Sequence, residues 1–98
     1  MHVAVVYSKG PNWSAEGPKG EHISRHIAHQ RKNFEAGKLV MGGPFMDEQG
    51  GMAILEVDSR DEAQQIVQSD PAVSGGLYVV ALHPWRIVLN RVGDDEQA

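Results

Sequence analysis

The sequence contains no cysteine, and this absence excludes disulfide bridges, thiolate metal sites and a cysteine nucleophile. It also has no apolar run of about 18 residues, the length typical of a membrane-spanning helix, and no signal-peptide pattern. Acidic residues outnumber basic ones, 13 to 9, so the net charge of −4 leaves no positive excess to bind phosphate groups. We therefore expect a cytoplasmic protein that binds neither nucleic acid nor membranes.

What is present is typical of one small soluble domain. The chain has 98 residues, of which 41% are hydrophobic and 22% charged. This is enough for one hydrophobic core and too little for two domains. We expect a single domain over residues 1–92 and a flexible acidic tail over 93–98, where "GDDEQA" has almost no apolar side chain.

Short β-branched runs alternate with amphipathic stretches along the chain. Gly37 ends the first helical stretch, and Ser59 with Glu62 forms a capping box at the start of the second. The segment 9–20 contains two Gly-Pro pairs and indicates a long loop, a candidate lid or binding loop. Pro84 restricts the last strand to an edge or a bend. The pattern predicts strands at 2–8, 38–45, 52–57 and 76–89, and helices at 21–36 and 59–69.

The order β-α-β-β-α-β is that of a ferredoxin-like α+β fold, an antiparallel sheet with two helices on one face. The other face is then open, and we expect it to be apolar, with Val3, Val5 and Tyr7 alternating along the first strand. Leaving this face bare would expose a large apolar patch. The expected assembly is therefore a homodimer that packs sheet on sheet.

Three of the five histidines lie on the first predicted helix. At 100° per residue, the apolar side chains of that helix form a stripe that should face the core: Ile23, Ile27 and Phe34. His26 then lies about 80° from the centre of this stripe, whereas His22 and His29 lie about 120° and 140° away, toward solvent. His26 is thus the histidine that borders the predicted buried face.

An acidic residue ends the apolar stripe of the second helix. This stripe contains Ala63, Ile66 and Val67, and Asp70 continues it in phase. A buried carboxylate must find hydrogen-bond donors or raise its pKa. An imidazole N–H is a fitting donor, and the carboxylate would fix the tautomer of a histidine whose other nitrogen can take a proton. The simpler interpretation is that Asp70 caps a short turn over 71–74; one carboxylate can do both.

Other chemistries have less support. His22 and His26 have the i, i+4 spacing of metal ligands on a helix, but no glutamate follows His22 and a third ligand must come from elsewhere. The glycine-rich "GGPFMDEQGG" lacks the lysine and hydroxyl residue of a phosphate-binding loop and is more typical of a hairpin turn. Trp13 and Trp85 are candidates to line a pocket for a flat ligand, although a tryptophan in a strand is more often a core residue.

Three segments resemble the YciI-like (YCII-related) family. "RHIAHQRKNFEAGKLVMGGP" (25–44) is similar to its pattern of a helical histidine, a glycine eleven residues later and a strand ending in Gly-Pro. "DSRDEAQQIVQSDPAVSGGL" (58–77) is similar to its second half, in which Ser-x-x-Glu-Ala leads to Asp-Pro and a Gly-Leu strand start. "HPW" (83–85) resembles its Pro-aromatic pair. Together they span nearly the whole chain, residues 2–89.

The resemblance implies a dimeric α+β barrel and an active-site His-Asp pair, which maps onto His26 and Asp70. A known activity in the family is the dehydrochlorination of a chlorinated hydroxyhydroquinone, a cofactor-free elimination. The family usually has an aromatic residue after Asp-Pro. Ala72 stands at that position here, so this part of any pocket would be smaller or differently shaped.

The expected function is that of a small lyase or isomerase without metal or cofactor, acting on a small cyclic or aromatic compound. His26 would be its general base or acid, and Asp70 would orient His26. Tyr7 is a candidate to hydrogen-bond an oxygen of the substrate, and Pro44 and Trp85 are further candidates to bind it. The alternative is a non-catalytic domain that binds a small ligand or has an accessory role, in which Asp70 only caps a helix.

Overall fold

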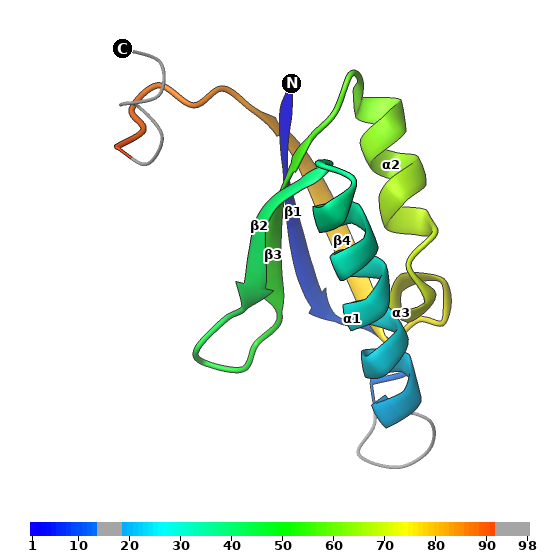
Figure 1. Ribbon diagram of the computed structural model, residues 1–98. Coiled ribbons are helices and arrows are strands. Elements are labelled where there is room, and N and C mark those ends of the chain that lie inside the picture. Colours follow the sequence, from blue (N-terminus) through cyan, green and yellow to red (C-terminus); the bar gives the residue numbers. More distant parts are fainter. Residues whose placement is uncertain (14–18, 92–98) are drawn as a thin grey trace.

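The computed structural model describes residues 1–13 and 19–91, which form a four-stranded antiparallel sheet with helices against one face (Figure 1). The strand order β2-β3-β1-β4 confirms the predicted ferredoxin-like fold. Residues 14–18 of the predicted loop and the predicted tail lie outside the described residues. The elements are β1 His2–Lys9, α1 Lys19–Glu35, β2 Leu39–Pro44, β3 Gly51–Glu56, α2 Arg60–Gln68, α3 Pro71–Ser74 and β4 Tyr78–Trp85.

Most element ends lie within one or two residues of their predicted places. The last strand is the exception, because it ends at Trp85 rather than residue 89. Trp85 pairs with His2, the first residue of β1, so the chain beyond it has no strand to pair with. As predicted, Pro84 lies on an edge strand and Ser59 caps α2, accepting a hydrogen bond from the Glu62 amide at 3.1 Å. Across the described ranges, no helix is both long and apolar enough to cross a membrane.

The core lies between the sheet and the helices, and one prediction about it is wrong. We expected Val3, Val5 and Tyr7 on the open sheet face, yet they are buried beneath the helices. The alternation along β1 is as predicted, but alternation by itself does not say which face the helices cover. The open face instead carries the other phase of each strand, with side chains that pair in register: Ala4, Val6, Met52, Ile54, Val79, Ala81 and Trp85.

Helix α1 is rotated away from its predicted orientation. Ile27 and Phe34 of the predicted buried stripe are 53% and 58% exposed. His29, expected to face solvent, is half-buried, and its Nε2 donates to the Ile66 carbonyl of α2 at 2.8 Å. His26 and His29 thus hold α1 against α3 and α2 through hydrogen bonds to Asp70 and to the Ile66 carbonyl. Two residues of the apolar stripe, Ile23 and Ile27, line a cavity instead.

Candidate functional site

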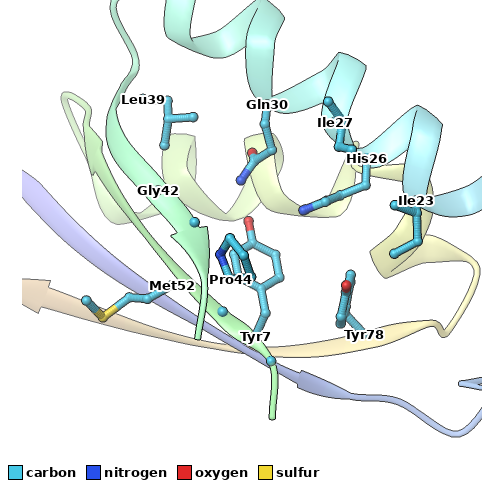
Figure 2. Close-up of a pocket in the computed structure, with 13 residues that line it drawn as sticks. Tyr7, Ile23, His26, Ile27, Gln30, Leu39, Gly42, Pro44, Met52 and Tyr78 are labelled. Carbon is cyan, nitrogen blue, oxygen red and sulfur yellow. The ribbon is translucent and has the colours of Figure 1, made fainter. Parts of the chain in front are cut away.

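A cavity of about 410 Å³ lies between α1 and the sheet (Figure 2). This volume is within the usual range of pockets that bind small molecules. One wall consists mainly of glycines, so little side-chain bulk projects into the cavity from there. The polar side chains that reach it come from β1, α1 and β4. The lining residues are Tyr7, Ile23, His26, Ile27, Gln30, Leu39, Gly42, Gly43, Pro44, Gly50, Gly51, Met52 and Tyr78.

The His26 ring points from α1 into this cavity (Figure 2). Asp70 binds the ring at Nδ1. Nδ1 of His26 is hydrogen-bonded to Oδ2 of Asp70, a carboxylate with no solvent exposure. A carboxylate accepts, so in the neutral ring Nδ1 carries the proton and Nε2 keeps a lone pair. The other carboxylate oxygen, Oδ1, accepts a hydrogen bond from the Ala72 amide at 2.9 Å. Asp70 thus caps α3 and orients His26 at the same time.

The backbone around Asp70 explains how it reaches His26. Asp70 is the N-cap of the one-turn helix α3, and Pro71 occupies the first helical position. Helix α2 ends at Gln68, so the chain turns at the point where the carboxylate must be buried. His26 lies 44 positions earlier, and contacts between α1 and α3 bring the two side chains together.

Tyr7 places a neutral hydroxyl beside His26. Its side chain is 5% exposed, and its ring meets the His26 ring edge to face at a centroid distance of 5.5 Å. Burial, with a smaller contribution from the negative charge of Asp70, raises the pKa of the Tyr7 phenol well above its usual range. The opposing effect of a hydrogen bond from the Gln30 side chain is smaller. The phenol therefore stays protonated and can donate to a ligand oxygen.

Tyr78 completes a cluster of three rings on the cavity wall. Its ring centroid is 5.4 Å from that of His26 and 5.8 Å from that of Tyr7. Burial and the charge of Asp70 raise the pKa of Tyr78 as well. Trp13 packs behind Tyr78 at 5.3 Å between ring centroids. Asn12 anchors this segment by donating its side-chain amide to the Gly75 carbonyl at 2.8 Å.

The structure brings together most of the predicted site residues. His26, Tyr7 and Pro44 line the cavity, and Asp70 lies directly behind His26. Trp85 does not line it. This residue is 48% exposed on the opposite face of the sheet, because side chains of β4 alternate and those at even positions face the helices.

Two polar lining residues, Gln30 and Tyr78, were not predicted from the sequence. Both carried a usable signal. Gln30 follows His26 by four positions and so lies on the same side of α1. Tyr78 is the first residue of β4, in phase with the positions of that strand that face the helices.

No group of three potential metal ligands occurs among the described residues. His22, the possible second ligand beside His26, lies against Gly75 instead. A Cβ atom at Gly75 would come within 2.9 Å of the His22 ring. What the site offers is a histidine base with a fixed tautomer and a neutral phenol donor beside it. This combination can take a proton from a ligand and stabilise negative charge on a neighbouring oxygen.

Comparison with known proteins identifies the family. The sequence profile of the YCII-related domain matches residues 1–86. The chain belongs to the YCII-related domain family. A similar protein is the uncharacterized protein YjpA of Bacillus subtilis (strain 168). The two sequences are 33% identical over 67 residues, which cover 68% of this chain and 79% of YjpA. The predicted family resemblance is thus confirmed.

A solved structure of similar fold is 5-chloro-2-hydroxyhydroquinone dehydrochlorinase (TftG) from Burkholderia phenoliruptrix AC1100, in complex with 2,5-dihydroxybenzoquinone. The match has a TM-score of 0.66 and covers 88% of this chain and 94% of TftG. The sequence identity is 23%, so this likeness establishes the fold that the YCII-related chain shares with TftG.

Proposed function

We propose that this protein is a lyase or isomerase that works without a cofactor and uses His26 for proton transfer. The supporting observation is the His26–Asp70 pair at the wall of the cavity, with the carboxylate on Nδ1 and the opposite ring nitrogen free to act. Asp70 is a positioning residue that selects this tautomer and stabilises the imidazolium once His26 has taken a proton.

The proposed reaction begins when Nε2 of His26 takes a proton from a C–H or O–H group of the substrate. The electron pair left behind moves toward an adjacent oxygen, which accepts a hydrogen bond from the Tyr7 hydroxyl. In a lyase, this pair then expels a leaving group as an anion, and His26 returns its proton to water. In an isomerase, His26 returns the proton to another atom of the same molecule.

A small planar ring that carries oxygen atoms is the proposed substrate class. The glycine wall and the apolar side chains of Ile23 and Ile27 leave space for a flat ring, and polar side chains reach the cavity from both the helix and the sheet. TftG, which has the same fold, was solved with such a molecule, 2,5-dihydroxybenzoquinone. An elimination of chloride from a chlorinated hydroxyhydroquinone is therefore the first reaction to test.

We further propose that the protein is a homodimer in which the open sheet faces of two copies pack together. This face carries exposed apolar side chains, among them Met52, Val79 and Trp85. Burying such a patch is a common driving force for association. A cytoplasmic location, which suits a chain without cysteine, belongs to the same proposal and is testable by cell fractionation.

The test is an assay of wild type, His26→Ala and Asp70→Asn with chlorinated hydroxyhydroquinones, monitoring loss of substrate and release of chloride. If His26 is the base, its removal should lower the rate by about 10²- to 10⁴-fold. A His26→Ala variant that turns over a substrate at the wild-type rate would exclude this role.

The alternative, a domain that binds a ligand without catalysis, is favoured by the cap that Asp70 provides for α3. It predicts ligand binding without turnover. It also predicts that Asp70→Asn retains the wild-type affinity, since asparagine caps a helix about as well as aspartate.

A further inference from the structure

Gln30 lies one turn beyond His26 on α1 and lines the same cavity. Figure 2 shows its amide nitrogen directed at the hydroxyl of Tyr7, with which the Gln30 side chain interacts. An amide nitrogen can only donate, so in a hydrogen bond between these two side chains the oxygen of Tyr7 is the acceptor.

A phenol has a single proton, which must point away from a donor that occupies one of the oxygen lone pairs. The Asp70 carboxylate, whose charge is felt by Tyr7, accepts hydrogen bonds from the Ala72 amide and from His26. With its hydroxyl at the cavity, Tyr7 can direct its O–H group toward a ligand bound there.

We propose that Gln30 is a positioning residue, which donates to the Tyr7 oxygen and thereby directs the Tyr7 proton at a ligand oxygen beside His26. The consequence for recognition rests on the proposed function. The site selects molecules that present a hydrogen-bond acceptor, such as a carbonyl or phenolate oxygen, next to the atom that His26 deprotonates. A ligand with only an N–H donor at that position would meet another donor and bind poorly.

The first test needs no ligand. The chain has only two tyrosines, so protein labelled with carbon-13 at the tyrosine Cζ gives two signals, which Tyr7→Phe assigns. Gln30→Met removes the donor at similar volume and should move the Tyr7 signal. Gln30→Glu supplies an acceptor, so Tyr7 should donate to the new carboxylate and its signal should move toward the phenolate position. Gln64→Met, on an exposed position of α2, is the matched control and should move neither signal.

If the Tyr7 signal stays at its wild-type position in both folded Gln30 variants, the proposed hydrogen bond does not exist and the inference is overturned. Should Gln30→Glu fail to fold, Gln30→Met alone decides between the two results.

The second test measures the binding of 2,5-dihydroxybenzoquinone by calorimetry. Tyr7→Phe and Gln30→Glu should each weaken binding about three- to tenfold, the usual effect of one lost hydrogen bond, and Gln64→Met should not. Wild-type affinity in both site variants would contradict the inference. If the wild-type protein does not bind the quinone, the proposed substrate class is wrong, and the carbon-13 signals still decide the role of Gln30.

Discussion

The substitution Asp70→Asn separates the two roles of the buried carboxylate. Asn retains an oxygen for the Ala72 amide, so the cap on α3 persists. The amide nitrogen of the asparagine would face Nδ1 of His26, and this nitrogen can only donate. His26 must then accept at Nδ1 and carry its proton on Nε2, the nitrogen that the mechanism requires to be free.

The expected effects on stability and activity differ in size. Replacing a charged hydrogen bond by a neutral one should lower the free energy of unfolding by about 1 kcal/mol. Asp70→Ala should cost about 3 kcal/mol, because the α3 cap is lost and the buried Nδ1–H group has no partner. The rate of proton transfer should fall by about 10²- to 10⁴-fold in Asp70→Asn, although the fold is nearly intact.

Three measurements check this reasoning on the same proteins. Urea unfolding gives the two free energies, and long-range proton–nitrogen correlation spectra of labelled histidine identify the tautomer of His26. We expect the Nδ1–H form in wild type and the Nε2–H form in Asp70→Asn. The reasoning is refuted if His26 keeps its proton on Nδ1 in Asp70→Asn, or if the asparagine variant is as unstable as the alanine one.

Three further predictions concern Tyr7, the β2–β3 turn and the open sheet face. The pKa of Tyr7 is higher in the folded protein than its unfolded value of 10, so folding retains this proton and stability is lost as the pH rises above 10. Tyr7 accounts for a loss of about 1.4 kcal/mol in the free energy of unfolding per pH unit in this range. A plot of this free energy against alkaline pH should therefore be less steep by that amount in Tyr7→Phe. Gly50→Ala should lower the free energy of unfolding by about 2 kcal/mol or more, because φ is +131° and a Cβ atom would lie 2.0 Å from the Tyr7 carbonyl oxygen. Gly43→Ala meets nothing within 4 Å, so an equal loss in both variants in urea unfolding would contradict this account. Trp85→Arg should dissociate the proposed homodimer in sedimentation velocity, whereas Met46→Arg in the fully exposed hairpin turn should not; dissociation by both, or by neither, would argue against packing through the sheet face.

The element order was predictable because it depends on residues close together in the sequence. The Ser59 cap, the left-handed Gly37 after α1 and the turn that begins at Asp70 each arise from interactions within four or five positions. Such interactions form in much the same way whatever surrounds them. For this reason the helices and strands were found with small errors at their ends.

The structure places His26 at the cavity and beside Asp70, although the helix orientation from which it was singled out differs from the observed one. The apolar stripe of α1 was expected to face the core, but the structure rotates it so that His29 faces α2. His26 lies near the boundary between the two faces and is partly buried in either orientation. The choice of Asp70 was sounder, since α2 buries Ala63 and Val67 as the stripe predicted.

The sequence by itself determined the element order and the caps, and it singled out His26 and Asp70 as candidates. Tertiary structure decided which face of each strand the helices cover, how α1 is rotated, and that Gln30 and Tyr78, but not Trp85, reach the cavity. These outcomes depend on contacts between residues far apart in the chain, such as His26 and Asp70, which are 44 positions apart. The hydrophobic periodicity of a sequence describes one helix or strand at a time. Hydrogen bonds and apolar contacts between different elements form only when those elements pack together, so periodicity cannot predict them.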